Sequence, residues 1–161
     1  MNTSFESAYA CDKEGNILIQ KKGQATSVSF MPEETAKMKD AIFTHNHPRG
    51  WKAPEGAMGR IGNSFSPGDV LVAINNDVAE MRAVTPNFTF SMKRPANGWG
   101  LSFENAKKEI NRIDAEITKD YADRIRNRTT TVNKASITHY HRLWKQFADK
   151  YGIEYTKAKT R

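Results

Sequence analysis

The chain has 161 residues, of which 38% are hydrophobic and 27% are charged, so it has enough apolar side chains for one packed domain and is not expected to be disordered as a whole. No apolar run approaches the ~20 residues of a membrane-spanning helix, and the N-terminus lacks the basic and apolar stretches of a secretory signal. The single cysteine, Cys11, excludes an internal disulfide framework and a cysteine-rich zinc site, so we expect a cytoplasmic protein in a reducing compartment.

The first hundred residues alternate short apolar segments with turn residues, which predicts a sheet with two helices. The expected strands are residues 5–11, 17–20, 26–30, 41–44, 78–84 and 87–92. A helix is expected over 32–39, where a proline and two acids suit a first turn, and another from Ser66 to about Asn75. Together these elements predict an α/β fold.

A long loop is expected between two of these elements, over residues 49–65. Four glycines fall within this segment, and glycine interrupts regular structure. Loops of this length inside a compact domain are usually functional or disordered.

The rest of the chain is expected to be helical. Apolar residues recur at steps of three and four from Phe103 to Ile125, and again from Ile137 to Tyr151 after a threonine-rich break. These stripes predict two helices that bury their apolar faces on the rest of the chain or on each other.

The basic residues are concentrated in the same region. Residues 103–161 carry 14 basic and 8 acidic side chains, a net of +6, whereas residues 1–102 carry 11 and 10, a net of +1. Two interpretations stay open. The helices bind nucleic acid, or they are solvated faces on which the interspersed acids form ion pairs.

Two histidines, His45 and His47, stand at the end of the expected strand 41–44. Alternate residues of a strand point to the same side, so both imidazoles can face one metal ion. Pro48 cannot continue the strand and turns the chain away. Taken alone, a His-x-His pair is also commonplace on protein surfaces. The same spacing at His139 and His141 falls on an expected helix, where residues two apart do not share a face.

The segment Ser66-Pro67-Gly68-Asp69 has a structural interpretation and a functional one. Serine at the N-cap, proline at the first position and an acid at the third position form a capping box that starts a helix. An acid in the first helical turn can also join two histidines at a strand end, and three protein ligands with one open position are typical of catalytic zinc.

Thr44-His45-Asn46-His47-Pro48, followed by Ser66-Pro67-Gly68-Asp69, resembles the His-x-His-Pro … Ser-x-x-Asp signature of the JAMM/MPN-type zinc metallopeptidases. Within this family, which includes RadC-like bacterial proteins, the likeness is greatest to small JAMM-like domains of phage morphogenesis proteins. The resemblance covers about residues 5–93 and implies a mixed β-sheet flanked by helices. We therefore expect a JAMM/MPN-like metal-binding core over residues 1–100 and a basic C-terminal helical pair, packed on this core, over 101–161.

The resemblance also implies roles for individual residues. His45, His47 and Asp69 would hold Zn²⁺, with water in the fourth position. Glu6, which stands where the family has its catalytic glutamate, would act as the general base, and Ser66 would help to hold the oxyanion. The implied reaction is hydrolysis of a peptide or isopeptide bond in a protein or peptide substrate.

Several alternatives stay open. Glu14, Glu33 and Glu34 are rivals to Glu6. The 17 residues between Pro48 and Ser66 are more than the family usually has, and they would form a substrate lid or block the site. The chain would otherwise be a metal-binding assembly module without catalysis, in the host cytoplasm if it is phage-encoded, or a RadC-like protein that contacts DNA through its basic helices.

Overall fold

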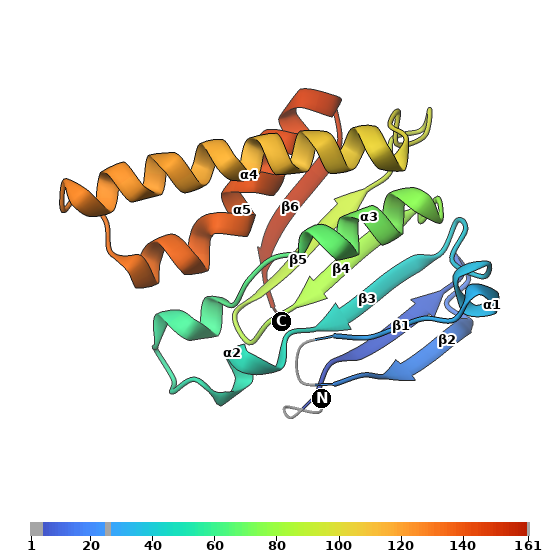
Figure 1. Ribbon diagram of the computed structural model, residues 1–161. Coiled ribbons are helices and arrows are strands. Elements are labelled where there is room, and N and C mark those ends of the chain that lie inside the picture. The colour runs from blue at the N-terminus through green and yellow to red at the C-terminus, as the bar shows by residue number, and fades with distance from the viewer. Residues whose placement is uncertain (1–4, 25–26, 161) are drawn as a thin grey trace.

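An α/β fold with one mixed sheet of six strands accounts for residues 5–24 and 27–160, the part of the chain that the structure, a computed structural model, describes (Figure 1). The strand order is β2-β1-β3-β4-β5-β6, and of these neighbours only β3 and β4 run parallel. The strands are β1 Ser7–Cys11, β2 Ile17–Lys22, β3 Ile42–Asn46, β4 Glu80–Val84, β5 Phe88–Lys93 and β6 Glu154–Lys159. The α/β class expected from the sequence is confirmed.

Five α-helices and one short 3-10 helix accompany the sheet in the described residues. They are α1 Pro32–Thr35, α2 Pro48–Lys52, the 3-10 helix η1 Met58–Ile61, α3 Pro67–Asn75, α4 Phe103–Arg126 and α5 Val132–Tyr151. The N-cap residues of α3, α4 and α5 are Ser66, Ser102 and Thr131. The side-chain oxygen of each accepts a hydrogen bond from the backbone N–H three residues later. No helix of the described chain is long and apolar enough to cross a membrane.

One face of the sheet is buried because apolar and polar side chains alternate along the strands. Ala8 and Ala10 of β1 and Phe43 of β3 point into the core, whereas the residues between them are half-buried. Helices α3 and α5 lie over this face, and α4 packs across both of them (Figure 1). The opposite face presents polar side chains, with Tyr9 paired to Thr44 in the sheet register.

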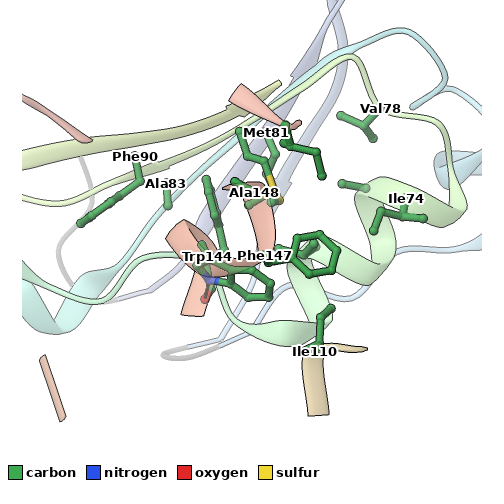
Figure 2. Close-up of a cluster of buried hydrophobic side chains, with 14 of the residues drawn as sticks. Ile74, Val78, Met81, Ala83, Phe90, Ile110, Trp144, Phe147 and Ala148 are labelled. Carbon is green, nitrogen blue, oxygen red and sulfur yellow. Dashed lines mark hydrogen bonds between the residues drawn. The ribbon is translucent and has the colours of Figure 1, made fainter. Parts of the chain in front are cut away.

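The apolar stripes of the C-terminal helices form a large part of the core. Trp144 and Phe147 of α5 lie between Met81 and Phe90 of the sheet on one side and Ile110 of α4 on the other (Figure 2). Each of these five side chains is at most 1% exposed. The C-terminal region is therefore packed on the sheet and continuous with its core.

The structure corrects four sequence-based expectations. Residues 27–30 are not a strand, and Thr26 lies outside the described residues. The helix expected over 32–39 has a single turn, and the segment 49–65, expected to be a loop, contains most of α2 and all of η1. The region after residue 102 is not purely helical, because β6 follows α5 and pairs with β5.

Physical reasons can be given for two of these differences. Phe30 packs its ring edge-on against Phe43, with 5.6 Å between the centroids, so this segment covers the buried face and does not extend the sheet. Strand β6 is mostly exposed along its length, so it lacks the apolar alternation that would have predicted a strand. Backbone pairing with β5 holds it in place.

Candidate metal centre

Both predicted histidine ligands project from the end of β3 toward the same point. Their Nε2 atoms are 3.0 Å apart, and their ring centroids are 5.0 Å apart. His45 is 2% exposed, and its Nδ1 is a buried atom without a hydrogen-bond partner among the described residues. The polar contacts of this imidazole are therefore made by Nε2. Helix α2 begins at Pro48, so the chain turns away directly after His47.

Asp69 reaches His45 from the start of α3, but among the described residues it does not belong to the group whose ligand atoms all lie within 4.8 Å of one another, which is Glu6, His45 and His47. Asp69 Oδ2 lies 3.5 Å from His45 Nε2. The same oxygen accepts hydrogen bonds from the backbone N–H of Ser66 at 2.7 Å and from its hydroxyl at 2.8 Å, and Ser66 Oγ accepts the Asp69 N–H at 3.3 Å. The capping box that the sequence predicts is therefore present, and it also fixes the carboxylate beside the histidine.

Glu6 joins the two histidines because of strand register. The antiparallel pairing of β1 with β3 ends at Ala8 opposite His45, and Glu6, two residues before Ala8, directs its side chain to the same, buried side of the sheet. Glu6 Oε1 is 3.9 Å from His45 Nε2, and the ligand atoms of Glu6, His45 and His47 all lie within 4.8 Å of one another. Glu6 is 8% exposed.

The rival acids have other surroundings. Glu34 accepts hydrogen bonds from the Lys21 ammonium and from the backbone N–H of Met31, at the start of α1. Glu14 is exposed beside Lys13 in the β1–β2 turn, and Glu33 is exposed in α1. Among these acids, Glu6 is the one that the structure brings to the histidines.

Charge and burial in this cluster oppose each other. Burial alone would lower the pKa of His45, but the carboxylates of Asp69 and Glu6 outweigh it, and this pKa is raised. Burial would raise the pKa of Asp69, but His45 and the hydrogen bonds from Ser66 hold this pKa well below its usual range. Burial and the neighbouring His45 lower the pKa of His47 to about 4. Burial raises the pKa of Glu6, against the effect of His45.

Asn46, which sequence reasoning passed over, ties the segment around Glu6 to β3. Its Oδ1 accepts the backbone N–H of Ser7 at 2.6 Å, and its Nδ2 donates to the carbonyl of Phe5 at 3.3 Å. These two peptide groups flank Glu6 on both sides. Asn46 is 3% exposed and stands between the two histidines, so one short segment of β3 presents both imidazoles and holds the carboxylate.

The cluster lies at one end of a cleft of about 600 Å³. Glu6, His47, Ser66 and Asp69 line this cleft. A face of α5 forms another part of the wall, through Asn133, Ser136, Ile137 and Tyr140. These four residues recur at helical spacing, and two of them, Ile137 and Tyr140, belong to the stripe that the sequence assigned to the buried face but that here lines the cleft.

The segment 49–65 forms another part of the cleft wall. Gly50, Gly59, Gly62, Asn63 and Ser64 line the cleft. Ser64 Oγ is 2.8 Å from the Tyr155 hydroxyl, which is 2.9 Å from His141 Nδ1, so this segment is fastened to β6 and α5. Position 62 of this segment favours glycine for two reasons. Its φ is 65°, in the left-handed region, and a Cβ there would lie only 2.5 Å from Thr85 Cγ2.

The second His-x-His pair does not form a comparable site. His139 Nε2 is 2.6 Å from Asp114 Oδ1 of α4, whereas His141 contacts Tyr155 of β6. The two imidazoles thus have different partners on different elements, as the helical spacing predicts.

Many basic side chains of the C-terminal helices have acidic partners within the chain. Arg112 pairs with Glu109 and Glu116, and Asp120 is bound by Arg142. Lys150 of α5 also reaches Glu109, at 2.7 Å. These contacts favour the interpretation of solvated, ion-paired helix faces, and contact with nucleic acid stays a prediction.

Comparison of the chain with protein-family models, with curated proteins and with solved structures finds no match. The likeness to the JAMM/MPN family therefore depends on the motif residues of the sequence alone.

Proposed function

We propose that the protein is a zinc-dependent hydrolase of the JAMM/MPN type, which cleaves a peptide or isopeptide bond with a metal-activated water. One observation carries this proposal. The His47 imidazole and the carboxylates of Glu6 and Asp69 lie around His45 Nε2, at 3.0, 3.9 and 3.5 Å, and these three side chains line a cleft. A catalytic site needs both this convergence and room for a substrate.

The donor set fits Zn²⁺. Imidazole nitrogen and carboxylate oxygen are ligands that zinc prefers, and His45 and His47 turn their Nε2 atoms toward each other at 3.0 Å. His45, His47 and Asp69 would hold the metal, as the motif implies. When bound, Zn²⁺ would lower the pKa of a water toward neutrality and polarise the carbonyl of the scissile bond.

Glu6 would move the proton in this reaction. It would accept a proton from the water at a carboxylate oxygen and return it to the leaving amine, which is the role of a general base and then a general acid. Asn46 supports this role by holding the peptide groups on both sides of Glu6.

The hydrogen bonding of Ser66 favours a second candidate function, a metal-binding module without catalysis. The hydroxyl proton of Ser66 is donated to Asp69 Oδ2, so it is already used within the helix cap. An oxyanion would need that proton. In this alternative, Ser66 serves to orient Asp69, and the site holds metal for structural purposes.

Metal analysis and two variants test the proposal. Wild-type protein and Glu6→Gln are expected to bind one Zn²⁺ each, whereas His47→Ala should bind it more than about 100-fold more weakly, because a ligand is lost. Glu6→Gln should slow cleavage of a peptide or isopeptide panel by about 10²–10⁴-fold. His139→Ala, which alters the other His-x-His pair, is the matched control and should retain zinc.

The outcomes separate the alternatives. Failure of wild-type protein to bind zinc would overturn both the hydrolase and the metal-module proposals. Zinc binding without cleavage of any panel member favours the metal module. If Glu6→Gln loses zinc while Asp69→Asn keeps it, Glu6 is the third ligand and the proposed roles of these two acids are wrong.

A further inference from the structure

Beside the candidate metal centre, the cleft is lined by a group of apolar side chains. We call Val28, Phe30, Phe43 and Val72 the apolar recess. Phe43 precedes His45 by two residues on β3, and its ring stacks on that imidazole with 5.6 Å between centroids. Because Phe30 packs edge-on against Phe43, the recess begins directly at the histidine that contacts both carboxylates.

Helix α3 connects the recess to the metal centre from the other side. Val72 follows Asp69 by three residues, so both side chains lie on the same face of the helix. Val28, Phe30 and Val72 are only half-buried, although Phe43 is 4% exposed. The recess therefore offers apolar surface that a ligand bound at the metal centre would cover.

The recess has no charged group to offer such a ligand. Among the described residues that line the cleft, acidic and basic side chains occur only in the metal centre, at Glu6, His47 and Asp69. The cation nearest to the Phe30 ring is the Lys21 ammonium, 5.5 Å from its centroid, and Glu34 pairs with it. A charged substituent placed in the recess would lose its hydration without gaining a partner.

We propose that the apolar recess binds an aliphatic or aromatic side chain next to the bond that is cleaved. The inference rests on the proposed hydrolase function and specifies its substrate class. Substrates would carry a bulky apolar residue directly beside the scissile peptide or isopeptide bond, and substrates with a charged residue in that place would be poor.

Binding of small hydroxamates to the zinc-loaded protein tests the recess without any need for a substrate. Acetohydroxamate, which has no side group to fill the recess, reports on the metal centre alone. Hexanohydroxamate and phenylacetohydroxamate should bind about tenfold more tightly or better, since each buried methylene contributes severalfold in affinity. 6-Aminohexanohydroxamate and succinic monohydroxamate should gain nothing over acetohydroxamate. Calorimetry gives the five affinities.

Variants of the recess residues test whether the recess causes the tighter binding of the apolar hydroxamates. Phe30→Ala and Val72→Ala should each reduce the preference for the apolar hydroxamates severalfold, measured as the ratio of their affinity to that of acetohydroxamate in the same variant. Leu71→Ala, one residue away on α3 and not among the residues lining the cleft, is the control. Thermal melting of each variant shows whether it is folded.

The outcomes distinguish this inference from the function on which it rests. If zinc-loaded wild-type protein fails to bind even acetohydroxamate, the proposed hydrolase site is wrong and the inference falls with it. If acetohydroxamate binds but all five probes have equal affinity, the metal centre stands and the recess is not a binding site. If the folded Phe30→Ala and Val72→Ala variants keep the wild-type preference for the apolar hydroxamates, the inference about the recess is overturned too.

Discussion

Different kinds of contact position the side chains of the metal centre and those of the remaining cleft wall. At the metal centre, positions follow from regular structure: alternation along β3 aligns two imidazoles, a helix cap fixes Asp69, and strand register brings in Glu6. The part of the wall formed by residues 49–65 and α5 depends on contacts between residues far apart in sequence. The comparison teaches that local signals orient His45, His47 and Asp69, whereas long-range strand pairing brings in Glu6 and long-range packing defines access to the site.

Removing the Trp144 side chain, which connects α5 to the segment before Ser66, should have the largest effect on stability. Trp144 of α5 is fully buried, and its Nε1 donates to the carbonyl of Phe65, directly before the Ser66 cap, at 2.7 Å. Trp144→Ala should cost about 3–5 kcal/mol of unfolding free energy, because it leaves a cavity and an unpaired carbonyl. Chemical denaturation measures this. A loss below about 1 kcal/mol would mean that α5 is not anchored to the metal centre through this residue.

Asn46 tests how far the metal centre depends on the hydrogen bonds that tie the distant segment around Glu6 to β3. Asn46→Ala removes both hydrogen bonds that flank Glu6 and leaves Glu6 itself unchanged. Misplacement of the base should lower kcat by up to about 100-fold with zinc still bound. Steady-state kinetics and zinc titration of the same sample check this. A variant that keeps full kcat would show that Glu6 is positioned by other contacts.

Tyr155 probes the cleft wall in a milder way. Tyr155→Phe keeps the ring but removes the hydroxyl that links Ser64 to His141. We expect a loss of about 1 kcal/mol in unfolding free energy, faster hydrogen exchange in residues 58–64, and unchanged zinc affinity. Hydrogen-exchange mass spectrometry can follow this segment. A change in zinc affinity would instead show that the hydrogen bonds of Tyr155 influence the metal centre.

The smallest expected effect concerns ion pairs away from the cleft. Arg112 and Lys150 lower the pKa of Glu109 to about 2. Because the pKa in the folded state lies below that in the unfolded state, the stabilisation is present above about pH 4.5 and is lost as the pH falls toward 2. Glu109→Gln should therefore cost less than about 1 kcal/mol at pH 7 and almost nothing near pH 2. Denaturant melts across this range test it.

The sequence by itself determined the features that depend on near neighbours. The α/β class, the hairpin of β1 and β2, the cap at Ser66, the shared face of His45 and His47, and the stripes of α4 and α5 all follow from periodicity or from contacts a few residues apart. Such signals are short-range, so one sequence suffices to detect them.

Only the tertiary structure decided the rest. It selected Glu6 among the acids, because pairing of β1 with β3 joins residues about 40 positions apart. It also added β6, whose mostly polar residues form a strand by backbone hydrogen bonding to β5. Contacts between residues far apart in sequence likewise place α2, η1 and the residues of α5 that line the cleft. Pairing of this kind depends on which strands and helices meet in space, and one sequence does not encode that in any local pattern.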